Sequence, residues 1–164
     1  MPPDIRPLAD DAEAQACAAI MATTDPWITL GRTFDRCLEA ARDTALERYV
    51  AVAEDEVVGF ILVSMRGAFV GYIKSIAVRE DWRGRGLGSA LLAFAEDRIL
   101  RDSPNVFICV SSFNSRARAL YERLGYEMVG ELRDFFVRGY DEQLLRKTIG
   151  PLTEFNRRNS SSVG

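Results

Sequence analysis

The sequence has 164 residues, of which 48% are hydrophobic and 27% are charged, and its formal net charge is −3. These values fit a single globular domain and argue against an intrinsically disordered chain. The balance of 21 basic and 24 acidic side chains gives no general attraction to nucleic acid or to anionic membranes, so neither is expected as a partner.

The sequence contains no histidine and three cysteines, Cys17, Cys37 and Cys109. The lack of histidine excludes Ser-His and Cys-His nucleophile pairs and most zinc sites, so no metal is expected. An odd number of cysteines without paired spacing indicates reduced thiols. The polar first ten residues lack the apolar stretch of a secretory signal, and no apolar run is long enough to span a bilayer. These features predict a cytoplasmic protein.

Hydrophobic periodicity, capping residues and turn residues predict the elements of the first half of the chain. We expect a short strand at 5–7, a helix from Asp10 or Asp11 to about Met21, a loop at 23–33 and a second helix to about Ala41. Strands at 49–53, 57–65 and 72–78 follow, and the short turns between them predict an antiparallel meander.

The second half is expected to contain a helix at 86–100, a strand at 106–111, a helix at 115–124 and strands at 126–132 and 143–147. The two strand-helix-strand passages should pair in parallel. The expected fold is therefore of the α/β class, a mixed sheet with helices on its faces. A low-complexity tail at 156–164 is expected to be frayed.

The most informative segment is a turn in which glycines alternate at 84, 86 and 88, where a helix begins. Glycine costs about 1 kcal/mol relative to alanine inside a helix, so this concentration needs a reason. Bare glycines let a ligand approach the N–H groups of a helix N-terminus, which attract anions. Arg83 and Arg85 add positive charge. The turn is therefore predicted to bind phosphate groups, although glycines that only solve a packing problem are the alternative.

Other phosphate-binding motifs fit this turn less well. A P-loop requires a Lys-Ser/Thr pair that does not follow here. A dinucleotide-binding loop requires a third glycine at Ser89 and a position after the first strand of a βαβ unit. An Arg-Gly-rich RNA-binding segment would be longer.

The segment from Arg83 to Gly88 resembles the Gln/Arg-x-x-Gly-x-Gly/Ala motif of the GNAT superfamily of N-acetyltransferases. About 30 residues later, the segment from Asn114 to Tyr126 resembles the second cofactor segment of that family, Asn-x-x-Ala-x-x-Leu-Tyr-x-x-x-Gly-Phe/Tyr. The resemblance implies one domain at 3–150 with a flexible tail at 151–164. It also implies a mixed, mostly antiparallel seven-stranded sheet flanked by about four helices.

The resemblance implies an acetyl-CoA-dependent N-acyltransferase. The glycine turn would bind the pyrophosphate, and the backbone of Ile76 and Val78 would pair with the pantetheine arm. The Val78 N–H would polarise the thioester carbonyl. The implied cofactor-binding residues are Ile76, Val78, Arg83, Gly84, Arg85, Gly86, Leu87, Gly88, Ser89, Asn114 and Tyr121.

Two side chains of the second segment have alternative interpretations. Asn114 matches the family asparagine that hydrogen-bonds the pantetheine arm, and its place before Ser115 also suits a helix N-cap. Both can hold, because the amide offers an acceptor and two donors. Tyr121 matches the family tyrosine that protonates the leaving CoA thiolate, and its helical spacing also suits a core aromatic.

The sequence shows no obvious general base. Where some relatives carry Glu or His, five residues before the motif asparagine, this chain has Cys109, a thiol better suited to packing. Tyr72 matches a tyrosine that some relatives place near the substrate amine. Waters linked to Tyr72 and Ser111 are one hypothesis, and a low amine pKa in an apolar site is another. Lys74 is expected on the same face as Tyr72, so that one of the two lines the cleft.

The resemblance implies that the loops at 23–33 and 133–141 form the acceptor site. The expected substrate-contacting residues are Asp25, Trp27, Tyr72 and Phe135. The Arg-Asp-Phe-Phe segment of the second loop is similar to that of ribosomal-protein alanine acetyltransferases, which favours a peptide N-terminus as acceptor. A small primary amine is the other candidate, and aromatics that only close the sheet are the alternative. A non-catalytic acyl-CoA-binding regulatory module is the rival function, and the resemblance allows a homodimer.

Overall fold

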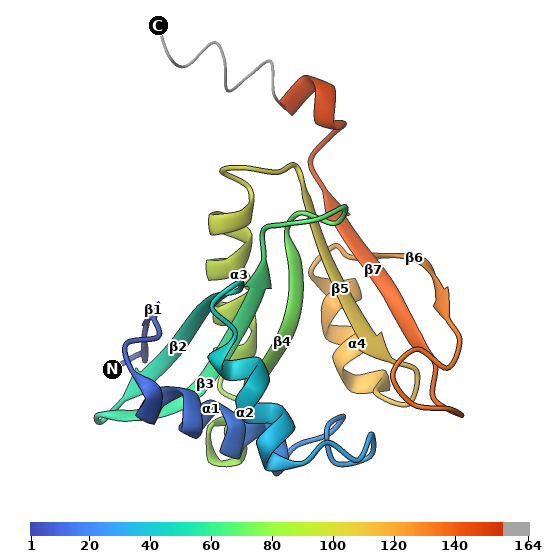
Figure 1. The fold of residues 1–164 in the computed structure, drawn as a ribbon. Coiled ribbons are helices and arrows are strands. Elements are labelled where there is room, and N and C mark those ends of the chain that lie inside the picture. The colour runs from blue at the N-terminus through green and yellow to red at the C-terminus, as the bar shows by residue number, and fades with distance from the viewer. Residues whose placement is uncertain (156–164) are drawn as a thin grey trace, which may run out of the picture.

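The computed structural model describes residues 1–155 and contains one seven-stranded sheet with helices on both faces (Figure 1). The strands are β1 Asp4–Pro7, β2 Glu47–Ala53, β3 Glu56–Ser64, β4 Tyr72–Val78, β5 Asn105–Ser111, β6 Glu127–Leu132 and β7 Glu142–Thr148. The α-helices are α1 Asp11–Ala22, α2 Phe34–Arg42, α3 Leu87–Ile99 and α4 Ser115–Arg123, and a 3-10 turn, η1, spans Glu80–Trp82. These bounds confirm the α/β class and lie close to the predicted ones.

The strand order is β1-β2-β3-β4-β5-β7-β6. The predicted antiparallel meander of β2, β3 and β4 is confirmed. Strand β4 pairs in parallel with β5, as expected, and α3 connects the two strands. The prediction that the second strand-helix-strand passage pairs in parallel is wrong. β7 lies between β5 and β6 and pairs antiparallel with both, so the sheet is mostly antiparallel.

The sheet separates two hydrophobic layers. Because strand side chains alternate between faces, β3 sends Phe60 and Leu62 to the layer under α1 and α2. Its neighbours Ile61 and Val63 join the layer that contains α3 and part of α4. All four side chains are fully buried, so β3 forms the centre of the core and fixes both helical layers against the sheet.

Helix α3 begins differently from the other three helices. Side chains of Asp10, Thr33 and Asn114 accept hydrogen bonds at the N-termini of α1, α2 and α4. Gly86 is the N-cap of α3, in a left-handed conformation, and no side chain caps that end. The first N–H groups of α3 therefore lack the partners that a capped helix would supply.

Strands β4 and β5 part soon after they begin. Their pairing is confined to Tyr72 with Phe107 and Ile73 with Ile108. The register of β4 against β3 shifts at Lys74, which has no partner opposite it. This β-bulge reverses the alternation of side chains along β4, so that Ile73 packs in the α3 layer and Ala77 in the α1–α2 layer. Bulges bend a strand, and this one lies where β4 leaves β5.

The structure describes the first residues beyond the predicted domain boundary at residue 150. Residues 152–155 are helical, and Phe155 is 9% exposed. The rest of the predicted flexible tail, 156–164, lies outside the described residues. Within residues 1–155, no helix is long and apolar enough to cross a bilayer.

Candidate active site

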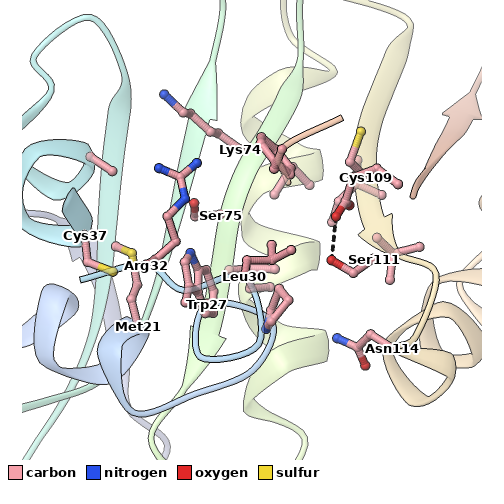
Figure 2. Close-up of a pocket in the computed structure, with 18 of the residues that line it drawn as sticks. Met21, Trp27, Leu30, Arg32, Cys37, Lys74, Ser75, Cys109, Ser111 and Asn114 are labelled. Carbon is pink, nitrogen blue, oxygen red and sulfur yellow. Dashed lines mark hydrogen bonds between the residues drawn. The ribbon is translucent and has the colours of Figure 1, made fainter. Parts of the chain in front are cut away.

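A cleft of about 730 Å³ opens where β4 and β5 part (Figure 2). Its floor is made by residues 72–76 of β4 and 108–111 of β5, one wall by α2 and the loop at 23–33, and the other by the start of α4. Its volume lies within the range of small-molecule sites. The cleft therefore has the size and shape to hold part of a cofactor together with an acceptor group.

The backbone of β4 presents unpaired groups to this gap. The N–H of Arg79 donates to the carbonyl of Val58 on β3 at 2.8 Å. Because hydrogen-bonding direction alternates along a strand, the N–H groups of Val78 and Ile76 point away from β3, toward β5. No residue of β5 pairs with them. An extended ligand with amide groups can therefore bind here as an additional strand.

The glycine turn presents unpaired N–H groups beside the cleft. Gly84 and Gly86 have φ values of 74° and 79°, which favour glycine over residues with a Cβ. Within the described part of the chain, the N–H groups of residues 84–89 donate no hydrogen bond to a carbonyl or side chain. Together with the positive end of the α3 dipole, these N–H groups are able to accept an anion as a hydrogen-bond partner.

The two arginines of the turn have definite partners. The Arg83 guanidinium donates to the Val78 carbonyl and to the Thr24 hydroxyl, both at 3.1 Å. The Arg85 guanidinium lies 4.8 Å from the centroid of the Trp82 ring. Arg83 therefore joins the turn to the end of β4, and both side chains place positive charge beside the unpaired N–H groups.

Asn114 caps helix α4 and also lines the cleft. Its Oδ1 accepts a hydrogen bond from the Ala117 N–H at 3.2 Å, so the N-cap interpretation is confirmed. The side chain also lines the cleft, and its Nδ2 donates to no residue within 1–155. The amide is thus oriented by the helix and keeps a donor for a ligand.

Tyr121 is a core aromatic that also reaches the cleft. Its side chain is 7% exposed, and its ring lies edge-on to Tyr126 with centroids 5.9 Å apart. It lines the cleft, and no residue within 1–155 hydrogen-bonds its hydroxyl. Burial raises the pKa of Tyr121 to about 12, so the phenol stays protonated at neutral pH.

Tyr72 and Cys109 lie together where β4 and β5 separate. Burial raises the pKa of Tyr72, and the neighbouring Cys109 side chain raises it further. Burial also raises the pKa of the Cys109 thiol. Both groups therefore stay protonated at neutral pH, and neither is a ready proton acceptor. Lys74 is exposed, and it lines the cleft together with Tyr72. Both side chains, rather than one of the two, therefore line the cleft.

The loop at 23–33 contributes two of the expected substrate residues to the cleft lining, Asp25 and Trp27. The Asp25 carboxylate accepts hydrogen bonds from the Thr29 N–H at 3.0 Å and from the Thr29 hydroxyl at 2.6 Å. The Asp25 carboxylate therefore stabilises the loop in addition to lining the cleft. The Trp27 ring packs at 6.4 Å from Phe60, which anchors this wall to the core.

The loop at 133–141 reaches the cleft through a different aromatic from the expected one. Phe135 is not a lining residue, whereas Phe136 is. The two rings pack 4.7 Å apart, and the Arg32 guanidinium lies 5.6 Å from the Phe136 centroid. Adjacent residues of a loop point in different directions, and the sequence alone does not reveal which one faces inward.

Sequence reasoning missed Glu142, the first residue of β7. Its side chain lines the cleft and is 2% exposed. It accepts a hydrogen bond from the Ser111 hydroxyl at 2.5 Å, and burial raises its pKa. The predicted last strand begins at 143, one residue after Glu142, whereas β7 begins at Glu142 itself. The pairing of Glu142 with Ser111 across β5 and β7 buries it, and no local sequence signal indicates that pairing.

Comparison with known proteins agrees with this geometry. Residues 8–126 match the family described as Acetyltransferase (GNAT) family. The chain is similar to an N-alpha-acetyltransferase of Saccharolobus solfataricus, at 26% identity over 68% of this chain and 75% of that protein. It is also similar to an N-alpha-acetyltransferase of Sulfurisphaera tokodaii, at 33% identity over 59% of this chain and 66% of that protein.

Solved structures share the fold at lower identity. The ribosomal-protein-S18-alanine N-acetyltransferase of Escherichia coli has a TM-score of 0.72 at 21% identity, covering 90% of this chain and 94% of that one. An aminoglycoside 6'-N-acetyltransferase complexed with coenzyme A has a TM-score of 0.74 at 19% identity, covering 90% of this chain and 98% of that one. With its family match, its relatives and its divided sheet, this chain belongs to the GNAT family of acetyltransferases.

Proposed function

We propose that this enzyme transfers the acetyl group of acetyl-CoA directly to an amine, without a covalent enzyme intermediate. The observation that carries the proposal is the set of unpaired N–H groups at 84–89 beside a cleft that contains Asn114 and Tyr121. Two cysteines, Cys37 and Cys109, line the cleft, and burial raises the pKa of both thiols, which argues against either as a nucleophile.

The residues of this chain fit acetyl-CoA in three places. The N–H groups of the glycine turn would hold the pyrophosphate, because they are unpaired and lie at the positive end of α3. The exposed backbone of Ile76 and Val78 would pair with the pantetheine arm, and the Nδ2 of Asn114 would donate to it. A solved structure with this fold is a complex with coenzyme A, which supports coenzyme A as a ligand of the fold.

Two groups would act on the reacting atoms. The Val78 N–H would donate to the thioester oxygen, where negative charge develops as the amine attacks. The Tyr121 phenol would donate its proton to the sulfur as the carbon–sulfur bond breaks. Because burial raises the pKa of Tyr121 to about 12, the phenol still carries this proton when the thiolate forms.

We propose a protein N-terminus as the acceptor, with a small primary amine as the second candidate. The relatives named N-alpha-acetyltransferases and the S18-alanine acetyltransferase favour the first. The aminoglycoside acetyltransferase favours the second. The wall that carries Trp27 and Phe136 offers apolar surface beside the reacting position, which suits the first side chains of a peptide.

The test is a screen of purified protein with acetyl-CoA against N-terminal peptides and primary amines, with the released thiol detected. Tyr121→Phe should lower kcat by roughly 100-fold or more, because the leaving thiolate loses its proton donor, while the affinity for acetyl-CoA is kept. Tyr49→Phe is the matched control. Tyr49 is similarly buried, at 8%, but packs on Phe94 away from the cleft, so its kcat should be unchanged.

A wild-type protein that binds acetyl-CoA but releases no thiol with any acceptor would favour the non-catalytic binding module. Wild-type turnover that Tyr121→Phe leaves intact would keep the transferase but remove Tyr121 from the mechanism.

A further inference from the structure

We infer that Glu142, whose carboxylate is hydrogen-bonded to Ser111, is the proton acceptor for the attacking amine. The inference rests on the proposed function and supplies the base that the sequence lacks at Cys109. Glu142 and Ser111 are directly opposite each other on β7 and β5, and both line the cleft. Figure 2 shows the Ser111 hydrogen bond as a dashed line on the β5 side of the cleft, below Cys109.

Glu142 differs from the partly buried glutamates Glu13, Glu47 and Glu96 in having no cationic partner among the described residues. Glu13 pairs with Arg6 at 2.7 Å, Glu47 with Arg98 at 2.7 Å, and Glu96 with Lys147 at 2.9 Å. Glu142 is more buried than these and accepts only the neutral hydroxyl of Ser111. Burying a carboxylate without a cation is costly, so its presence in the cleft points to a chemical role rather than a structural one.

The orientation of Glu142 supports this role. The next residue, Gln143, accepts a hydrogen bond from the Arg118 guanidinium of α4 at 2.8 Å. Because neighbouring side chains of a strand point to opposite faces, Gln143 anchors β7 to α4 while Glu142 faces the cleft. Within residues 1–155, its second carboxylate oxygen accepts no hydrogen bond, so that oxygen is available to an incoming ammonium group. The raised pKa of Glu142 makes it a stronger base than an exposed carboxylate.

The proton balance closes with these groups. The acceptor enters as an ammonium ion and gives one proton to the Glu142 carboxylate, directly or through the Ser111 hydroxyl. The free amine attacks the thioester carbon, the carbon–nitrogen bond forms, and the carbon–sulfur bond breaks. The sulfur takes the Tyr121 proton, and the second proton of the nitrogen restores the phenol. Glu142 then releases its proton to solvent. The products are an amide, CoA thiol and one proton.

Glu142→Gln is the decisive variant, because the amide keeps the shape of the side chain but cannot take a proton. With the peptide that the wild type acetylates fastest, kcat/KM at pH 7 should fall by roughly 100-fold or more, with acetyl-CoA affinity unchanged. The deficit should shrink as the pH rises past the pKa of a peptide amine, about 8, because the acceptor then arrives already neutral. Glu131→Gln, on the exposed face of β6, is the matched control and should behave as wild type.

Ser111→Ala tests whether Glu142 takes part in proton transfer, because a purely structural role would not shift the pH profile of kcat/KM. The Ser111 hydrogen bond lowers the pKa of Glu142, so its removal should move the acidic limb of the kcat/KM profile to higher pH. If the wild type is active and Glu142→Gln has the same pH profile of kcat/KM, the inference is overturned. The proposed function would still stand. A wild type that acetylates no amine while binding acetyl-CoA would instead overturn the proposed function.

Discussion

At the scale of single residues, Glu142 should make the stability of the protein depend on pH. Burial raises the pKa of Glu142 in the folded state, so the folded protein holds this proton more tightly than the unfolded chain. Its stabilising contribution is therefore fully present below the pKa of an unfolded glutamate, about 4.3, and is lost as the pH rises through the folded pKa.

Thermal unfolding of wild type and Glu142→Gln between pH 4 and pH 8 measures this effect. We expect the Tm of the variant, relative to wild type, to rise with pH, because the amide never carries the buried charge. Glu131→Gln should show no such trend. A difference between Glu142→Gln and wild type that stays constant across this range would mean that the carboxylate does not titrate as its burial requires.

The same residue shows what local sequence reasoning cannot reach. The motif residues Asn114 and Tyr121 can be identified from the sequence, because their spacing is local and belongs to one predicted helix. Glu142 belongs to the site because it pairs with Ser111 of β5, about thirty positions earlier in the chain. Nothing in the sequence near residue 142 indicates that pairing. Phe135 and Phe136 are a similar case, because both are aromatic and only the loop conformation selects Phe136.

At the scale of elements, phosphate binding by the glycine turn can be tested by comparing two glycine-to-alanine variants that introduce similar backbone strain. Gly86 and Gly67 both have left-handed φ values, 79° and 82°, and a Cβ would meet no atom within 4 Å at either position. Alanine at either position should therefore cost a similar amount of stability, about 1–2 kcal/mol. Gly86→Ala should also raise the KM for acetyl-CoA roughly tenfold, equivalent to about 1.4 kcal/mol, because its methyl group enters the proposed phosphate site.

Gly67 lies in the turn between β3 and β4 and does not line the cleft, so Gly67→Ala should leave that KM unchanged. Steady-state kinetics with varied acetyl-CoA, together with denaturant unfolding, separates the two effects. Equal KM values for the two variants would argue against pyrophosphate binding at the turn.

Element boundaries were largely predictable, whereas the order of the last strands was not. Periodicity and caps are local properties, and they located β4 at 72–78. The insertion of β7 between β5 and β6 depends on side-chain packing across the sheet. The β-bulge at Lys74 is also set by tertiary contacts, because an unbroken alternation of Tyr72, Lys74 and Ile76 is equally compatible with the sequence.

At the scale of the whole molecule, acetyl-CoA should stabilise the fold. At 100 times its dissociation constant, a ligand adds about 2.7 kcal/mol to the free energy of unfolding. For a chain of this length, that corresponds to a rise in Tm of about 5–10 °C. S-acetylpantetheine, which lacks the diphosphate, is the control and should stabilise much less at the same concentration. Equal stabilisation by both compounds would contradict a diphosphate site at the N-terminus of α3.

The separation of β4 from β5 also leaves part of the β4 edge without a neighbouring strand. Open strand edges on a protein surface recruit strands from other molecules. Here residues 72–76 of β4 line the cleft together with Trp27 and the loop at 23–33. A pantetheine arm bound as proposed would pair with this edge and leave no free strand position there.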